Sequence, residues 1–233
     1  MIYNMEKELR YIDSEIRAAE DSRNVDGYAL LFNTTSRNLG GFVERIESTA
    51  IDGVIENSDI MAVLNHDASR GILARSRFGV GSLTLSVDEK GLRYTFDAPH
   101  TALGDECLEY LRRGDITQSS FAFAVKEDSW EKQSDGTYVR TIKKFDRLFD
   151  VSPVYEPAYF GTDVSCRSFE DFKAEEERKE AEAKAEAERL EAEKREAEEA
   201  EKQAKLKEYY DQLRAEYQTA LEKGKAMNDR TQN

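Results

Sequence analysis

The chain has 233 residues, and its 48 Asp and Glu side chains outnumber its 34 Lys and Arg side chains, which gives a formal charge of −14 at pH 7. This excess of acid argues against nucleic acid or an anionic membrane surface as the main partner, because both require basic patches. The sequence has no run of about 18 apolar residues that could span a membrane, and its charged N-terminal stretch lacks the apolar core of a signal peptide. Cys107 and Cys166 are too few and too far apart for a disulfide framework or a zinc knuckle. These features predict a soluble, intracellular protein with two free thiols.

The first part of the chain, about 165 residues, predicts a β-rich domain. Short strands are expected in "GYALLFN", "SSFAFAV" and "TYVRTIKKF". The stretch "GSLTLSVDEKGLRYTFDA" alternates apolar and polar residues on both sides of a turn at residues 88–91, which is the pattern of a β-hairpin. "GDECLEYLRRG" has apolar residues at helical spacing, and Gly114 is expected to end that helix. A single barrel or sandwich of short strands with one helix accounts for these patterns.

The tripeptide Asn65-His66-Asp67 follows an apolar run in "AVLNHDASRGILARS" and contains one of only two histidines in the chain. The change from apolar to polar predicts the end of a strand and the start of a loop, where side chains held by a rigid scaffold often do chemistry. An imidazole beside a carboxylate could be a general base, a metal ligand or part of a surface turn. The local sequence leaves these three interpretations open.

A second candidate position is Ser120, in "GDITQSSFAFAVKEDSW". If residues 119–125 form a strand, the side chains of Phe121, Phe123 and Val125 point to one face and are expected to line the core. Ser120 then lies on the opposite face among small alanines, where its hydroxyl could meet a substrate. Ser119 shares the Phe face and is the poorer candidate. By its spacing alone, a serine in a strand is more often structural than functional.

The second part of the chain predicts a long charged helix. Between Gly161 and Gly224 the chain has neither glycine nor proline. It is rich in Ala, Glu, Lys and Arg, which are strong helix formers. Glu recurs three or four residues from Lys or Arg, a spacing that favours ion pairs on a helix. An apolar stripe appears towards its end, at Leu206, Tyr210, Leu213, Tyr217 and Leu221. A solvated helix with a modest self-association seam and a docking helix for another protein both fit this pattern.

Five motifs taken together resemble the prohead, or head maturation, serine proteases of tailed bacteriophages. They are "GYALLFN", "VLNHD", "GSLTLSVDEKGL", "LRRGDITQSSFAF" and "FDVSPVYEPAYFGTDV", and they occur in the family's order from about Leu9 to Arg167. The resemblance implies a β-rich (α+β) barrel of the herpesvirus assemblin type, followed here by the long helix or coiled coil. It also implies a serine endopeptidase that cleaves scaffold and capsid proteins in the bacterial host cytoplasm, inside the assembling prohead. We therefore expect a protease domain at residues 1–166, a scaffold-like helical extension at 167–225 and a frayed tail at 226–233.

The resemblance assigns His66 as the general base and Ser120 as the nucleophile. A serine hydroxyl is a weak nucleophile until an imidazole accepts its proton, and the imidazole needs a third group that orients it. Proteases of the assemblin type have this third group after the serine, and by that order we assign it to Asp150 in "LFDVSPV". Three alternatives remain open at this stage, namely Asp67, Glu44 and His100.

One departure from the family pattern is Ala122, where related proteases often have glycine; alanine is small enough that we expect little harm to the site. No cofactor is expected, and no metal site either, because two distant histidines and scattered acids offer no ligand spacing. The expected partners are the major capsid protein and scaffold segments as substrates, together with further copies of the chain. The charged helix is interpreted as a scaffold or tether within the assembling shell. A competing hypothesis is a non-enzymatic scaffolding protein that uses a degenerate protease domain to bind coat protein.

Overall fold

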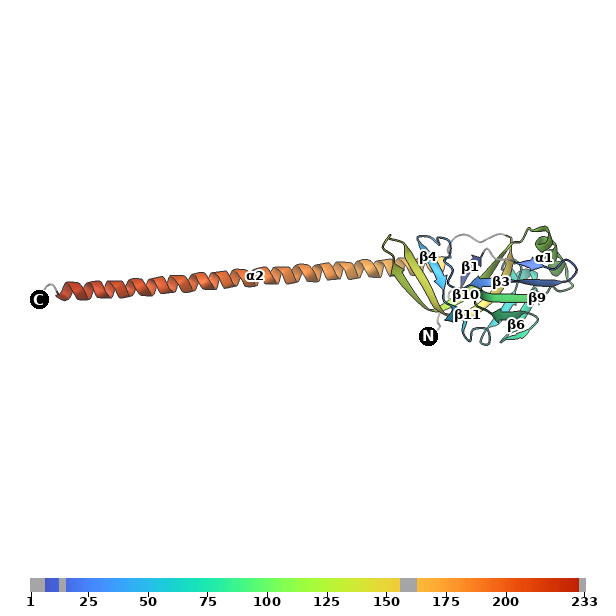
Figure 1. Ribbon diagram of the computed structural model, residues 1–233, viewed down its shortest axis with the longest axis horizontal. Helices are drawn as coiled ribbons and strands as arrows, with labels where there is room; N and C mark the ends of the chain where they lie inside the picture. The colour runs from blue at the N-terminus through green and yellow to red at the C-terminus, as the bar shows by residue number, and fades with distance from the viewer. Residues whose placement is uncertain (1–6, 13–15, 156–162, 231–233) are drawn as a thin grey trace. The chain divides into compact units, whose positions relative to one another are not determined.

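The computed structural model describes residues 7–12, 16–155 and 163–230, and Figure 1 shows them as a β-rich domain and a long helix. The chain therefore forms a mixed, sheet-rich α+β domain with a C-terminal helix. The elements, in chain order, are β1 Glu8–Ile12, β2 Arg17–Ala18, β3 Asn24–Leu31, β4 Phe42–Ile46, η1 Ser48–Ile51, β5 Asp59–Ala62, η2 Ala68–Arg70, β6 Ala74–Arg77, β7 Val80–Gly81, β8 Thr84–Val87, β9 Gly91–Asp97, α1 Ala102–Arg113, β10 Gln118–Lys132, β11 Tyr138–Val154 and α2 Asp163–Arg230.

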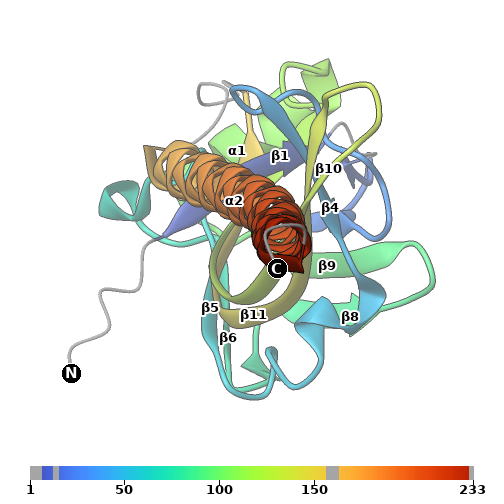
Figure 2. The same cartoon turned by 90° about the vertical axis from the view of Figure 1, so that its left-hand side faces the viewer.

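The strands form two sheets. The larger sheet has the order β1-β10-β11-β5-β6-β7, with β4 also paired to β11, and the smaller sheet has the order β2-β3-β9-β8. The long antiparallel hairpin of β10 and β11 runs through the larger sheet. Strand β5 joins β11 in parallel, and these two strands are labelled side by side in Figure 2. This topology places the N-terminal strand β1 directly beside β10.

The core lies between the two sheets. Phe121, Phe123 and Phe145 of the larger sheet stack on one another with ring centroids 4.7 to 6.3 Å apart. They belong to the same buried cluster as Leu92 and Tyr94 of the smaller sheet. The alternation of residues 119–125 explains this packing, because a strand sends every second side chain to the same face.

Two local sequence predictions are confirmed. The hairpin expected at residues 81–98 is the antiparallel pair β8 and β9, in which Val87 lies opposite Leu92. The helix expected before Gly114 is α1, whose first turn is capped by the Thr101 side chain and whose last residue is followed by Gly114 in a left-handed conformation with φ of 78°. Only glycine adopts that conformation readily, so the helix ends where the sequence predicted.

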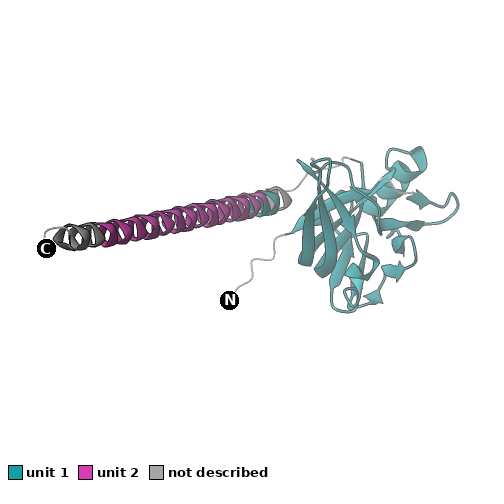
Figure 3. Cartoon of the chain, turned by 60° about the vertical axis from the view of Figure 1, so that its left-hand side comes forward, with its two compact units in different colours: residues 1–172 teal, residues 173–233 magenta. Residues whose placement is uncertain are grey.

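The boundary between the two parts of the chain lies later than the expected 166/167. The chain divides into a compact unit at residues 1–172 and a second unit from residue 173 onward, coloured separately in Figure 3. The aromatic rings of Phe169 and Phe172 explain the difference, because both stack on Trp130 of the β domain at centroid distances of 5.5 and 5.6 Å. The first turns of α2 are thus packed as part of the β domain.

Helix α2 also exceeds the expected range of 167–225, since it runs from Asp163 to Arg230 and includes residues 226–230 of the expected frayed tail. Gly224 alone does not end it, because an isolated glycine weakens a helix by only about 1 kcal/mol. Beyond residue 172, ion pairs three or four residues apart lie along the helix, such as Arg195 with Glu191 at 2.6 Å. Four members of the predicted stripe are exposed, namely Leu206, Tyr210, Leu213 and Tyr217. The side chain of Leu221 lies outside the described residues, as do residues 156–162 of the motif "FDVSPVYEPAYFGTDV".

Candidate active site

His66 lies in the loop that follows β5, as the apolar run ending at residue 64 predicted. Asn65 and His66 both have positive φ angles, of 55° and 59°. This conformation is uncommon for residues other than glycine and persists where the surrounding structure holds the backbone in it. The Asn65 N–H donates to the Pro153 carbonyl at 2.9 Å, which fixes the loop to β11. The backbone therefore directs the His66 ring over the larger sheet.

Ser120 lies in β10, opposite Tyr11 of β1 on one side and Ser152 of β11 on the other. Its Oγ is 2.5 Å from His66 Nε2, and its hydroxyl also has the Arg10 carbonyl as an acceptor at 2.8 Å. Ser120 is completely buried. Ser119 points to the opposite face, where its Oγ is 2.9 Å from the Tyr94 hydroxyl in the core. The two adjacent serines therefore have different environments, as strand alternation predicted.

Asp150 lies in β11, opposite Ala122 of β10, next to a register shift at Phe149. Its Oδ1 is 2.5 Å from His66 Nδ1 and accepts the Ser152 hydroxyl at 2.8 Å. Its Oδ2 accepts a hydrogen bond from Lys7 Nζ at 3.0 Å. Burial acts to raise the pKa of Asp150, but the hydrogen bond and charge of His66 together with the Lys7 ammonium outweigh it, so the pKa lies below its usual value. Asp150 is therefore ionised at neutral pH.

The alternatives for the third group lie elsewhere. Asp67 caps η2, where its carboxylate accepts the Ser69 backbone N–H at 3.0 Å. Glu44 is buried and bound by two arginines, Arg10 at 2.7 Å and Arg140 at 3.2 Å. His100 is exposed in the turn before α1. Of the four candidates, Asp150 is the one hydrogen-bonded to His66.

Two further polar side chains at this site were missed from the sequence. Ser152 shares Asp150 Oδ1 with His66 and lies 3.2 Å from His66 Nδ1. Its position two residues after Asp150 in a strand was a usable signal, because such residues share a face. Lys7 comes from the first described residues of the chain, 143 positions from Asp150, and no local pattern points to it.

Ala122, the departure from the family pattern, is fully buried beside Asp150 in the sheet. Within residues 7–12, 16–155 and 163–230, no three His, Cys, Asp or Glu side chains are grouped so that they could hold a metal ion. The helices of this described part include none that is long and apolar enough to cross a membrane. The polar cluster that remains to be explained is the one around His66.

A serine hydroxyl, an imidazole and a buried carboxylate in one hydrogen-bonded series are the constellation of serine hydrolases. Comparison with known proteins defines the class more closely: the chain belongs to the caudovirus prohead serine protease family, whose model matches residues 12–175. It is thus a protease of phage head maturation. Members of this family act within the assembling prohead. Among solved structures it is similar to the bacteriophage T4 capsid assembly protease, with a TM-score of 0.40 and 13% identity over 65% of this chain and 99% of that one. No curated protein sequence matches the chain.

Proposed function

We propose that the protein is a serine endopeptidase in which Ser120 is the nucleophile, His66 the general base and Asp150 the group that orients the imidazole. The observation that carries this proposal is the continuous series of contacts from Ser120 Oγ to His66 Nε2 and from His66 Nδ1 to Asp150 Oδ1, both at 2.5 Å. The three residues come from β10, the loop after β5, and β11. Their convergence supports catalysis, because separate structural roles would not require one shared imidazole.

The chemistry follows from the partners of each ring nitrogen. With the neutral imidazole protonated at Nδ1, that N–H donates to Asp150 and leaves the Nε2 lone pair free to accept the Ser120 proton. As Ser120 Oγ attacks a peptide carbonyl, its proton passes to Nε2, and the ionised Asp150 stabilises the imidazolium that forms. His66 then gives the proton to the leaving amine, and a water molecule hydrolyses the acyl-enzyme by the same route.

The Ser120 hydroxyl has only one proton and two acceptors, His66 Nε2 and the Arg10 carbonyl. When the imidazole is doubly protonated, Nε2–H must donate to Ser120 Oγ, and the hydroxyl then donates to Arg10. When the imidazole is neutral, the hydroxyl donates to His66 and is activated. The hydrogen-bond pattern therefore supports activity that is lost at acid pH.

The proposed substrates are capsid and scaffold proteins, in keeping with the family to which the chain belongs. We further propose that the β domain is a barrel of the herpesvirus assemblin type, which the order His66, Ser120 and then a third group in a sheet-rich domain supports. In this proposal, α2 acts as a scaffold or tether through its stripe of exposed Leu and Tyr side chains.

The proposed function is tested by incubating the full-length protein with its coat and scaffold proteins. Ser120→Ala is expected to abolish their cleavage and any slow self-cleavage. Ser119→Ala is the matched control, because it removes an equally buried hydroxyl from the adjacent position, on the core side of the strand. We expect Ser119→Ala to lower the free energy of unfolding by about 1–3 kcal/mol, because the buried Tyr94 hydroxyl loses the Ser119 hydroxyl as its partner. The activity per folded molecule is expected to stay unchanged. Unchanged processing by Ser120→Ala would exclude Ser120 as nucleophile. Absence of cleavage by the wild-type protein would instead favour the non-enzymatic coat-binding function.

The role of α2 is tested separately in the inactive Ser120→Ala background. The variant Leu213→Gln/Tyr217→Gln removes part of the exposed stripe, whereas Lys205→Gln/Glu208→Gln changes the polar surface without changing net charge. We expect the first pair to weaken self-association and co-assembly with coat protein, measured by sedimentation, and the second pair to have little effect. Equal association of both variants would rule out the stripe as the tether.

A further inference from the structure

Strand β1 brings two groups to the candidate active site. The strand pairs with β10 in a register that sets Tyr11 opposite Ser120, and the Arg10 carbonyl accepts the Ser120 hydroxyl at 2.8 Å. Lys7, immediately before the strand, donates to Asp150 Oδ2 at 3.0 Å. One short segment thus contacts both ends of the Ser120–His66–Asp150 series.

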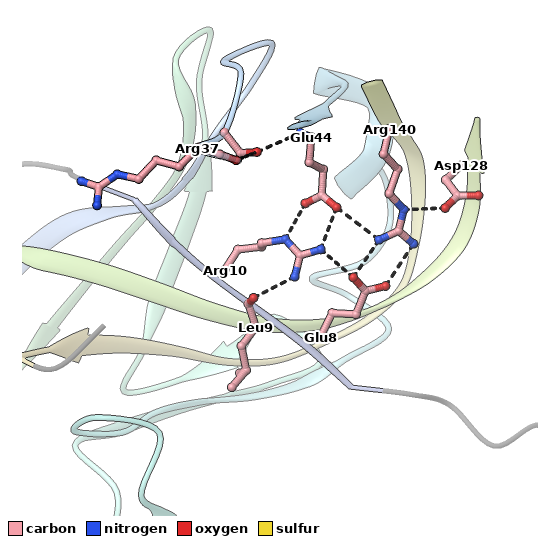
Figure 4. A network of polar contacts seen from close by, with 8 residues as sticks. Glu8, Leu9, Arg10, Arg37, Glu44, Asp128 and Arg140 are labelled. Carbon is pink, nitrogen blue, oxygen red and sulfur yellow. Dashed lines mark hydrogen bonds and ion pairs between the residues drawn. The ribbon is translucent and has the colours of Figure 1, made fainter. Parts of the chain in front are cut away.

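The opposite face of β1 is held by a buried ion network, defined here as Glu8, Arg10, Glu44 and Arg140 (Figure 4). Arg10 donates to Glu44 from Nε at 2.8 Å and from a terminal nitrogen at 2.7 Å. Arg140 donates to both Glu8 oxygens, at 2.7 and 3.0 Å. All four side chains are 3% to 6% exposed.

This network fixes the position of β1 because a shift of the strand would separate its charges. Within the network the two arginines balance the two glutamates, and Arg140 also donates to the partly exposed Asp128 at 2.6 Å. An uncompensated buried charge costs several kcal/mol. A one-residue slip against β10 would turn Glu8 and Arg10 to the other face of the sheet. The positions of Lys7 and of the Arg10 carbonyl therefore follow from the network.

Lys7 holds the oxygen of Asp150 that His66 does not use. His66 and Ser152 both contact Oδ1, whereas Lys7 contacts Oδ2. Within the described part of the chain, the titratable groups that contact this carboxylate are His66 and Lys7, and the Ser152 hydroxyl is the neutral donor. A carboxylate held at both oxygens cannot rotate about its Cβ–Cγ bond without losing a contact. Lys7 thereby keeps Oδ1 directed at His66 Nδ1.

We infer that Lys7, placed by the network-bound strand β1, is a positioning residue for the reaction of Ser120. This inference rests on the proposed function and extends it to a side chain outside the triad. Lys7 acts through Asp150 and does not itself touch the reacting atoms. Its amine is a fixed cation beside the Asp150–His66 pair, so it also disfavours the doubly protonated imidazole.

The test compares the full-length variants Lys7→Met and Lys7→Arg with the control Lys126→Met, which removes an exposed lysine from β10. Rates are measured on a peptide cut by the wild type. Because the Lys7 side chain is 45% exposed, we expect Lys7→Met to lower kcat by about 3–10-fold, with KM unchanged. The acid limb of its kcat/KM profile is expected to move to higher pH by a few tenths of a unit, roughly, because a cation near the pair is lost. Lys7→Arg should recover most of kcat, and Lys126→Met should match the wild type.

Unfolding in urea, followed by the fluorescence of Trp130, verifies that each variant is folded at the assay temperature. Wild-type kcat and an unmoved acid limb in Lys7→Met, alongside an inactive Ser120→Ala, would overturn the role of Lys7 and leave the proposed function intact. A change in KM alone would also overturn it, because it would indicate substrate binding. Activity in Ser120→Ala would instead remove the proposed function itself.

Discussion

The buried ion network around Arg10 gives the sharpest prediction about stability, and Glu44→Leu is the change that tests it. Glu44 accepts three hydrogen bonds, two from Arg10 at 2.7 and 2.8 Å and one from Arg140 at 3.2 Å. Its side chain is 3% exposed, so water cannot replace these partners in the folded state. The substitution therefore leaves Arg10 with Glu8 as its carboxylate partner, at 2.7 Å, while Arg140 keeps Glu8 and the partly exposed Asp128, at 2.6 Å.

The expected magnitude follows from the balance of charge in this network. Removing one partner of a buried ion pair typically costs about 3–5 kcal/mol, because the remaining charge stays desolvated and unpaired. We expect Glu44→Leu and Arg10→Met each to lower the free energy of unfolding by that amount. The double variant keeps Arg140 bound to both Glu8 and Asp128, so we expect it to cost at most about 2 kcal/mol, since apolar replacement of a whole buried pair is often close to neutral.

Urea unfolding at pH 7 measures these free energies, with the fluorescence of Trp130 as the signal. Trp130 is the single tryptophan of the chain, and its ring centroid lies 5.5 Å from the Arg140 guanidinium carbon. The signal therefore reports on the β domain, whereas far-UV circular dichroism is dominated by helix α2. The reasoning is refuted if either single variant costs less than about 1 kcal/mol, or if the double variant costs the sum of the two.

Asp150→Asn is expected to lower kcat by about 10³–10⁴-fold, because the amide disturbs the imidazole tautomer while keeping the shape of the side chain; a peptidase assay that shows less than a tenfold loss would contradict the assigned role. Asp150 and Glu8 both have a lowered pKa in the folded state. Their contribution to stability is therefore complete above the ordinary carboxyl range, about pH 4–4.5, and is lost as the pH falls through the lower folded-state values. A urea midpoint that rises as the pH falls below about 4 would contradict this predicted loss of stability. Phe169→Ala should destabilise the β domain by about 3–5 kcal/mol, because its ring is 8% exposed among aromatic partners; an unchanged urea midpoint would show that the start of α2 is not packed there. Burial raises the pKa of the Cys107 thiol to about 12, so iodoacetamide should not alkylate this residue in the native protein at pH 8, as peptide mass spectrometry can verify.

The parts of the fold that could be predicted from the sequence are those fixed by nearby residues. The hairpin of β8 and β9 follows from alternation around a turn, and the end of α1 follows from Gly114, because both signals act within a few residues. The buried ion network could not be predicted in this way. Its side chains come from β1, β4 and β11, and charged residues in strands ordinarily indicate solvent exposure.

The candidate site shows the same division. The strand pattern indicated which serine lies on which face, but it could not bring His66 to Ser120, because 54 positions separate them. The resemblance to a family supplied that pairing, and the order of the groups pointed to Asp150. Lys7 stayed hidden because its contact is made across the sheet. The true end of the β domain was accessible in principle, since Phe169 and Phe172 are three residues apart on a helix and so share a face.

The complete burial of Ser120 has a consequence for timing. If Ser120 is the nucleophile, as proposed, a peptide bond can be cut only when the groups packed around its hydroxyl move apart, so the frequency of this opening sets an upper limit on turnover. Between openings, the proposed coat and scaffold substrates would contact the domain without being cleaved. Under the proposed function, the packing around Ser120 therefore limits how often the enzyme attacks substrates that surround it at high concentration.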